Sequence, residues 1–255
     1  MIAKEFTILK ERSPVEVWTS SPEGIDAIGQ LNLFCWGMRG LSHKFNGAVG
    51  NALSYAQLAK LEAPVTDTGT RALADRVAAS LAPAATLGTR LADLGYWRAP
   101  VFERGDARAW ITEAARSTPE TGAAAALSVP IGGRPLPVIA DAHLVRRCLQ
   151  ILMDLAADPG GCRSPALYAR RLRAAARGAP ASVALGVRIE TGDAQGRARL
   201  VALTGAGGEV AGDPVAQMAL HFCRLVARAH AGALVLVLVG RNPLRLELRL
   251  PPATP

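Results

Sequence analysis

One histidine of this sequence, His43, has unusually small neighbours for a residue inside a helical pattern. Apolar residues recur around it at helical spacing: Phe34, Met38, Leu41, Phe45, Val49 and Ala52. At about 100° per residue, His43 falls opposite this apolar stripe and shares its face with Gly40, Gly47 and Gly50. Each glycine costs a helix about 0.5–1 kcal/mol relative to alanine. Three glycines around one exposed imidazole therefore indicate that a reacting group must approach it closely, and imidazole can serve as a nucleophile or proton carrier.

Two long helices are predicted to position His43. No proline occurs in residues 24–62, and Pro64 ends the first helical pattern because proline disfavours helix in the residue before it. A second helix is expected to start from an N-cap at Asp67 and to be kinked or interrupted at Pro83. The apolar stripes of both helices exceed what a lone hairpin can bury, so residues 24–99 predict a homodimeric four-helix bundle.

After this hairpin the pattern changes to shorter elements. Helices are expected at 106–117, 141–157, 164–177 and 213–230. Strands are expected at 126–131, 182–190, 197–203, 233–239 and 244–250. Helices that alternate with a mixed sheet predict a two-layer α/β sandwich. The fold class is therefore expected to be α+β, with a leader at 1–23, the hairpin at 24–99 and the sandwich at 100–255.

The bulk composition excludes several classes of protein. Half of the residues are hydrophobic and 20% are charged, which permits a buried core and excludes a disordered polyion. The longest apolar run, 233–239, is far shorter than the roughly 20 residues that span a bilayer. The segment Met1–Arg12 lacks the apolar core of a signal peptide. A cytoplasmic protein without membrane contact is expected.

The net charge of +8 suits an acidic partner, but it does not by itself predict nucleic-acid binding. Aromatic residues make up only 5% of the chain and the arginines are spread along it, so no nucleic acid is expected as a partner. The chain has four cysteines without a CxxC pair: Cys35, Cys148, Cys162 and Cys223. We expect buried free thiols rather than disulfides or a metal site.

The segment around His43, Gly40-Leu41-Ser42-His43-Lys44-Phe45-Asn46-Gly47, resembles the phospho-acceptor box of bacterial histidine kinases. In that box an acidic residue follows the histidine, and Asn or Thr stands two positions further on. Later segments fall where the ATP-binding domain of the family has its Asn-containing helix, its Asp-x-Gly-x-Gly loop and its last helix: Asp141–Asp158, Val201–Gly207 and Gln217–Gly232. The resemblance covers residues 25–250 and implies the family's fold.

The ATP-binding positions depart from the family's pattern. Leu203 stands where the adenine-binding Asp precedes the glycines, and leucine cannot accept a hydrogen bond. Asp158 replaces the metal-binding Asn, although a carboxylate can still hold a hard cation. Asp213-Pro214 replaces the second glycine box, and about six residues after Gly207 leave no room for a nucleotide lid. ATP is therefore not expected to bind, and an Arg-rich helix at 163–177 is an unexplained insertion.

The phospho-acceptor box departs too, because Lys44 replaces the acidic base that would take the imidazole proton during attack on ATP. The resemblance then implies a histidine phosphotransferase that shuttles a phosphoryl group between receiver-domain aspartates of response regulators, with no cofactor of its own and Mg²⁺ supplied by the receiver. His43 is the expected nucleophile, Lys44 and Arg39 offset charge, and Asn46 orients an oxygen. Receivers are expected to dock over Gly40, Gly47 and Gly50.

Two rival functions stay open. The chain could be a non-catalytic pseudokinase that binds and sequesters a kinase or response regulator, or a still-active kinase with an unusual nucleotide site. A metal site at Asp141-x-His143 is disfavoured because Asp141 is better explained as a helix cap. His221 and His230 share one helix without a third ligand at useful spacing.

Overall fold

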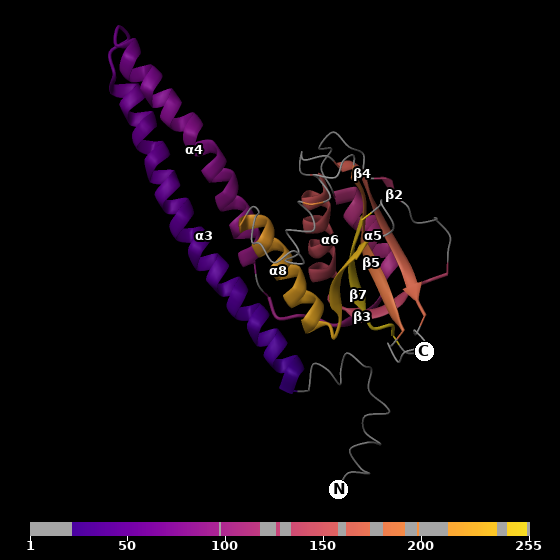
Figure 1. Cartoon of the computed structure of the whole chain (residues 1–255). Coiled ribbons are helices and arrows are strands. Elements are labelled where there is room, and N and C mark those ends of the chain that lie inside the picture. Colours follow the sequence, from indigo (N-terminus) through magenta and orange to yellow (C-terminus); the bar gives the residue numbers. More distant parts are fainter. Residues whose placement is uncertain are drawn as a thin grey trace. The chain divides into compact units, whose positions relative to one another are not determined.

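The hairpin consists of α3 (Pro22–Glu62) and α4 (Thr68–Gly95), close to the expected bounds. In this computed structural model the described residues are 22–96, 98–117, 126–127, 134–157, 162–173, 181–191, 198, 214–238 and 244–253. The chain divides into two compact units. We call residues 32–98 the hairpin unit, and the described residues of 22–31 and 99–253 the sheet unit (Figure 1). The first turns of α3 thus belong with the sheet unit.

Local signals set the boundaries of α4. The Asp67 side chain caps the helix, since its Oδ1 accepts from the Thr70 backbone N–H at 3.0 Å and its Oδ2 accepts from the Thr70 hydroxyl at 2.7 Å. The hydrogen bond from the Thr70 backbone is the main cause that lowers the pKa of Asp67. Pro83 lies inside α4, which continues on both sides of it. The helix is therefore not interrupted at Pro83, the alternative of a kink there stays a prediction, and the cap is confirmed.

Several small residues, together with Leu91 and Leu94 of α4, are buried in the seam of the hairpin between α3 and α4. Ser42, Val49 and Ala56 are buried at seven-residue spacing on α3, a repeat that keeps one helix face toward a neighbouring helix. On α4, Gly88 and Gly95 are buried. A Cβ at Gly88 would collide with the Asn46 side chain, and one at Gly95 would lie 2.6 Å from the Arg39 backbone nitrogen. The two helices therefore approach closely through glycine.

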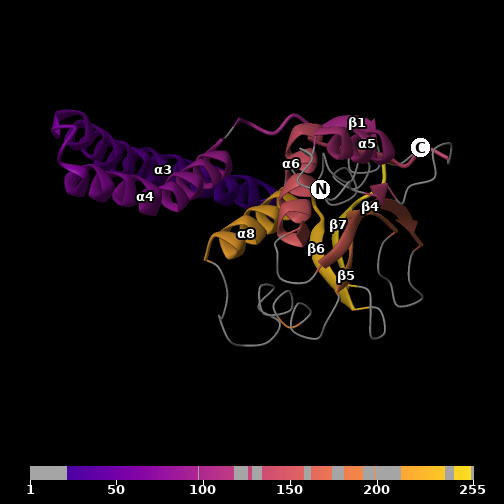
Figure 2. The same cartoon turned by 90° about the horizontal axis from the view of Figure 1, so that it is seen from above.

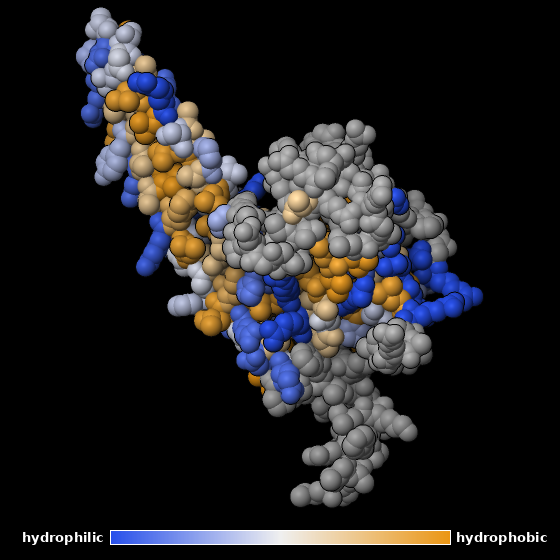
Figure 3. Space-filling view, in the orientation of Figure 1, coloured by the Kyte–Doolittle hydropathy of each residue, from blue (hydrophilic) through white to orange (hydrophobic). Residues whose placement is uncertain are grey.

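This seam leaves large apolar side chains on the outside of the hairpin. Leu41, expected in the apolar stripe, is 47% exposed, and Leu73 of the second stripe is 55% exposed. Further exposed members are Leu33, Trp36, Tyr55, Leu58, Leu61 and Val77. Apolar surface accordingly runs along the hairpin in the space-filling view (Figure 3). An apolar surface of this extent is typical of an interaction site.

The sheet unit has two layers. Its five-stranded sheet has the order β2-β4-β5-β7-β6, antiparallel except for the parallel pair of β2 and β4. The strands are β2 (Ala126–Leu127), β4 (Cys162–Leu172), β5 (Ser182–Thr191), β6 (Ala233–Leu238) and β7 (Leu244–Leu250). The helices α5 (Ala107–Ser117), α6 (Ala142–Ala157) and α8 (Pro214–Ala229) pack on one face of the sheet (Figures 1 and 2). A separate antiparallel ribbon joins β1 (Glu103–Asp106) to β3 (Pro137–Ala140).

The core lies between the helices and the sheet. Alternate residues of a strand point to opposite faces, and the register pairs Leu185 with Leu248 and Val187 with Leu246, all buried on the helix-covered face. The helices contribute side chains at helical spacing, which are also buried: Leu144, Leu149, Leu152, Leu220, Phe222 and Leu225. The α+β fold class, with a hairpin followed by a two-layer α/β sandwich, is confirmed.

One predicted element has the wrong type. The helix expected at 164–177, rich in alanine and arginine, is the strand β4 as far as Leu172. Alanine and arginine are good helix formers, but β4 pairs along its length with β5, and this long-range pairing overrides the local preference. The ribbon of β1 and β3 was not predicted. The last two residues of the expected leader, 22 and 23, belong to α3, and its other residues lie outside the described residues. The strand at 197–203 except Ala198, and most of the strand at 126–131, also lie outside them.

Candidate functional site

His43 lies in the middle of α3, and its side chain is exposed. The adjacent Ser42 is only 5% exposed because it faces α4, and its hydroxyl donates to the Arg39 carbonyl at 3.3 Å. One residue further along a helix turns the side chain by about 100°. The buried Ser42 therefore directs His43 away from the seam, as predicted.

The glycines predicted to surround His43 leave open space. A side chain added at Gly40, Gly47 or Gly50 would meet no atom within 4 Å. In a helix, residues three and four apart are surface neighbours, so Gly40 and Gly47 lie beside His43 on successive turns. The imidazole is thus accessible along the helix axis in both directions. Such a surface admits a partner close to the α3 backbone.

The other three predicted site residues differ in their surroundings. Lys44 is exposed and directly follows His43 in α3. The Asn46 side chain lies against the α4 backbone at Gly88, so α4 restricts its position. The Arg39 backbone lies against Gly95, while Arg39 as a residue is exposed. His43 therefore lies at an uncovered centre of the site, and α4 contacts the site at Asn46 and Arg39.

The charged residues of α3 around His43 are all basic. Residues 27–61 contain no Asp or Glu, and their cations are Arg39, Lys44 and Lys60, apart from His43. A side chain that could take a proton from His43 as a carboxylate base is therefore missing from this stretch of α3. The positive charges instead favour an anion that approaches the imidazole.

Two apolar residues belong to the same face and were not predicted. Trp36 lies seven residues before His43, hence on the same side of the helix, and is 72% exposed. Leu33 is 68% exposed one turn earlier. Exposed aromatic side chains are enriched at protein interfaces. The seven-residue spacing from His43 was the sequence signal that could have identified Trp36.

The helix α6, which was expected to correspond to the Asn-containing helix of the family, begins at an N-cap formed by Asp141. Asp141 is fully buried; its Oδ1 accepts from the Leu144 N–H at 3.0 Å and its Oδ2 from the Val101 N–H at 2.8 Å. Both oxygens are thus committed to backbone donors, which confirms Asp141 as a cap. Among the described residues, no group of three His, Cys, Asp or Glu side chains is placed to hold a metal ion.

His230 is a second structural histidine. It is fully buried at the end of α8, where its Nε2 accepts from the Asp141 N–H at 3.0 Å and its Nδ1 lies 2.7 Å from the Val226 carbonyl. With Nε2 as an acceptor, Nδ1 must carry the proton and donate to Val226. Burial is the main cause that lowers the pKa of His230, so the ring is neutral. His230 therefore has a structural role in the core of the sheet unit.

The remaining predictions about this part of the chain differ in outcome. Cys35, Cys148 and Cys223 are buried free thiols, as expected. The positions on which the loss of ATP binding was predicted, Asp158, Leu203–Gly207 and Asp213, lie outside the described residues. Among the described residues, no helix is both long and apolar enough to cross a membrane.

Known proteins were compared with the chain by sequence and by structure. No protein-family model matches it, and no curated sequence matches it. The structure is similar to full-length ShkA in complex with AMPPNP, with a TM-score of 0.52 and 17% identity over 86% of this chain and 46% of ShkA. The chain therefore spans about half the length of ShkA.

Two further solved structures are similar. For the Acinetobacter baumannii histidine kinase AdeS the TM-score is 0.46 with 12% identity, over 80% of this chain and 94% of AdeS. For a histidine kinase of Burkholderia phymatum STM815 the TM-score is 0.40 with 17% identity, over 84% of this chain and 98% of that chain. ShkA is itself a histidine kinase, and the likeness to it shows that this chain has a histidine-kinase-like fold.

Proposed function

We propose that this chain is a histidine phosphotransferase of a bacterial two-component phosphorelay, in which His43 carries a phosphoryl group between receiver-domain aspartates without using ATP. One observation carries the proposal. His43 is exposed on a helix face that its neighbouring glycines leave open, near Arg39 and Lys44, in a segment without Asp or Glu. The histidine-kinase-like fold supports it, since a helical hairpin of this kind is where the family carries its phospho-acceptor histidine.

The chemistry balances without a further reactant. A ring nitrogen of neutral His43 attacks the phosphorus of an aspartyl phosphate, and the N–P bond forms as the P–O bond to the aspartate breaks. The freed carboxylate leaves with the donor receiver, and the other ring nitrogen keeps its proton during the attack. A second receiver then reverses these steps. Arg39 and Lys44 stabilise the phosphoryl oxygens, Asn46 orients one of them, and the receiver holds Mg²⁺.

The lack of Asp and Glu in residues 27–61 of α3 separates this proposal from an ATP-dependent kinase. Autophosphorylation in the family uses an acidic residue at the position of Lys44 to accept the imidazole proton. A charged lysine cannot accept a proton, and residues 27–61 offer no Asp or Glu in its place. Lys44 does suit transfer from an aspartyl phosphate, in which the incoming oxygens are negatively charged.

The test is a transfer experiment with the full chain and a panel of phosphorylated receiver domains. The proposal expects an acid-labile phosphoryl group on the wild-type chain with at least one receiver, and none on His43→Ala. The control is His221→Ala, which removes another exposed histidine from α8 and should leave transfer unchanged. Labelling by Mg-ATP alone, or a rise in melting temperature with Mg-ATP, would support an active kinase instead.

A second candidate is a pseudokinase that binds a kinase or response regulator without phosphoryl transfer. The exposure of Trp36 and Leu33 on the His43 face favours it, because an apolar docking patch needs no chemistry at the histidine. This candidate predicts a receiver that binds the wild-type chain tightly, loses affinity with Trp36→Ser, and never transfers its phosphate.

A further inference from the structure

The second face of the sheet, opposite α5, α6 and α8, carries a cluster of arginines. Strand alternation and the register place Arg170, Arg245, Arg249 and Arg188 on this face, together with Tyr168 and Glu247. We call these six residues the arginine face. Gly186 of β5 lies between Tyr168 and Glu247 at the centre of this face, because β5 pairs Gly186 with Tyr168 on one side and with Glu247 on the other.

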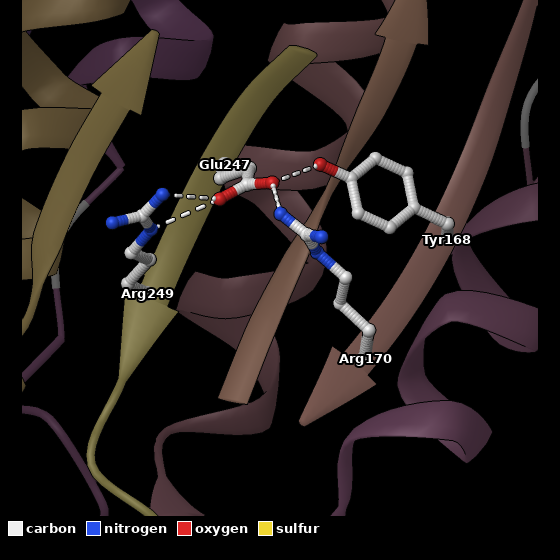
Figure 4. Close-up of polar contacts among 4 residues, drawn as sticks. All are labelled: Tyr168, Arg170, Glu247 and Arg249. Atoms are coloured by element: carbon white, nitrogen blue, oxygen red, sulfur yellow. Dashed lines mark hydrogen bonds and ion pairs between the residues drawn. The ribbon is translucent and has the colours of Figure 1, made fainter. Parts of the chain in front are cut away.

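Glu247 is the centre of the arginine face and is fully buried. The Tyr168 hydroxyl donates to its Oε1 at 2.7 Å, and Arg170 Nη2 donates to the same oxygen at 2.6 Å. Arg249 Nε donates to Oε2 at 2.9 Å, and Arg249 Nη2 lies 2.9 Å from that oxygen (Figure 4). Both carboxylate oxygens are thus held by donors from β4 and β7.

Gly186 is required for this arrangement. A Cβ at Gly186 would collide with the Leu246 carbonyl and would lie 3.1 Å from the Glu247 Cα. With no side chain between them, Tyr168 and Glu247 meet across the intervening strand. Burial by itself raises the pKa of Glu247, but the hydrogen bonds from Tyr168, Arg249 and Arg170 outweigh it and lower that pKa, so the carboxylate stays charged.

The arginine face holds more positive charge than the single carboxylate of Glu247 can neutralise. One carboxylate pairs with two guanidinium groups, and the side chains of Arg170 and Arg249 are still 40% and 34% exposed. Arg245 lies 5.8 Å from the Tyr168 ring centroid and makes no ion pair with any described residue. The register also places Arg245 directly opposite Arg188, so the face carries two guanidinium groups besides those that pair with Glu247. Packing alone does not account for these arginines.

The composition of the face decides which anion it fits. Single-stranded nucleic acid needs exposed aromatic rings for base stacking, but Tyr168 is 9% exposed and its hydroxyl is committed to Glu247. A membrane surface needs apolar side chains that insert, but the exposed large apolar residues of the described chain lie between Ile25 and Val101, outside this sheet. Guanidinium forks match carboxylates in a bidentate geometry.

We propose that the arginine face binds a run of aspartate and glutamate side chains on a partner protein. The guanidinium groups come from β4, β5 and β7, in which neighbouring strands lie about 4.8 Å apart, so the carboxylates must be closely spaced, as in an acidic segment. Glu247 holds Arg170 and Arg249 in place before binding, which reduces the entropy lost on association. This site belongs to the sheet unit and does not depend on the function proposed for His43.

The test measures binding of a short peptide of alternating aspartate and glutamate to the full-length chain. Arg245→Gln together with Arg249→Gln should weaken binding about tenfold, since exposed charge pairs contribute modestly one by one. The matched control is Arg116→Gln with Arg228→Gln, which removes the same charge from exposed positions on α5 and α8. This control should change the affinity by less than about twofold.

Four outcomes decide the proposal. Selective loss in the arginine-face variant, with the melting temperature within a few degrees of the wild type, supports it. An equal loss in the control variant overturns it, because the peptide would then sense only net charge. Tighter binding of a single-stranded oligonucleotide or of anionic vesicles than of the peptide overturns it as well. Failure of the peptide to bind at low salt also overturns it.

Discussion

The hairpin unit and the sheet unit each hold a histidine, and the two residues have opposite surroundings. His43 is exposed between glycines whose added side chains would meet no atom, whereas His230 is buried with both ring nitrogens engaged. A buried imidazole whose two ring nitrogens both make hydrogen bonds contributes to stability and is not accessible to reactants. An exposed imidazole contributes little to stability and remains available. In the proposed function His43 carries the chemistry, whereas His230 belongs to the scaffold.

The same contrast holds for the charged residues of the two units. Arg39 and Lys44 lie beside His43 in a segment without acidic residues, so nothing acidic on that stretch of helix offsets them. In the sheet unit, Glu247 fixes Arg170 and Arg249. The two proposals agree with this difference: the His43 face is left open for a reacting group, and the arginine face is organised before binding.

The largest expected effect is on His43. Replacing His43 with Ala should abolish phosphoryl transfer from receivers, because the proposed N–P bond forms on the His43 imidazole. The melting temperature should change by less than about 2 °C, since surface changes are usually within about 0.5 kcal/mol. Thermal unfolding and transfer assays on the same preparation check both parts. Retention of transfer by this variant would contradict the proposed function.

The next effect concerns association of the hairpin, whose exposed apolar residues support the predicted homodimer. Leu73→Glu should produce a monomer, because Leu73 lines an apolar groove with Tyr55 and Val77 and an unpaired charge buried there costs several kcal/mol. Light scattering at micromolar concentration measures the mass. The control is Ala79→Glu, which introduces the same charge at another exposed position of α4. A monomeric wild type would exclude the bundle.

A smaller effect is expected from closing the bare face. Gly47→Arg should reduce receiver affinity about tenfold, by placing a long side chain beside His43, and should leave the dimer intact. Gly29→Arg is the matched control, because Gly29 is also an open helical position of α3. Titration of a receiver followed by fluorescence measures the affinity. Equal affinities of the two variants would place the docking surface elsewhere.

The smallest effect is the pH dependence that His230 brings to stability. Burial lowers the pKa of His230 below the ordinary 6.5, so the unfolded chain binds this proton more readily than the folded one. Its stabilising contribution is complete above pH 6.5 and falls as the pH drops below it, by at most about 1.4 kcal/mol per pH unit. Melting temperatures at pH 7.5 and 5.5 should therefore differ less in His230→Gln than in wild type.

His43→Ala is the control for this last prediction, since it removes a histidine but keeps the buried ring of His230. His221 shifts stability in the same direction, because burial and the nearby Arg224 and Arg228 lower its pKa. It is present in all three proteins and cancels in the comparison. An unchanged slope in His230→Gln would show that the buried histidine is not the titrating group.

Sequence alone determined the elements that depend on neighbours in the chain. The bounds of α3 and α4, the Asp67 cap and the outward direction of His43 all follow from helical periodicity and local hydrogen bonds, which join residues three or four apart. The open space around Gly40, Gly47 and Gly50 follows from the same periodicity.

Only the tertiary structure decided what depends on distant partners. A strand gains its hydrogen bonds from another strand, so β4 overrode the helix preference of its alanines and arginines once β5 was beside it. Glu247 meets Arg170 and Tyr168, which lie 77 and 79 residues away in the chain, and no local spacing indicates that meeting. The close approach of α4 to α3 likewise depends on Gly88 facing Asn46, which only the packed hairpin brings together.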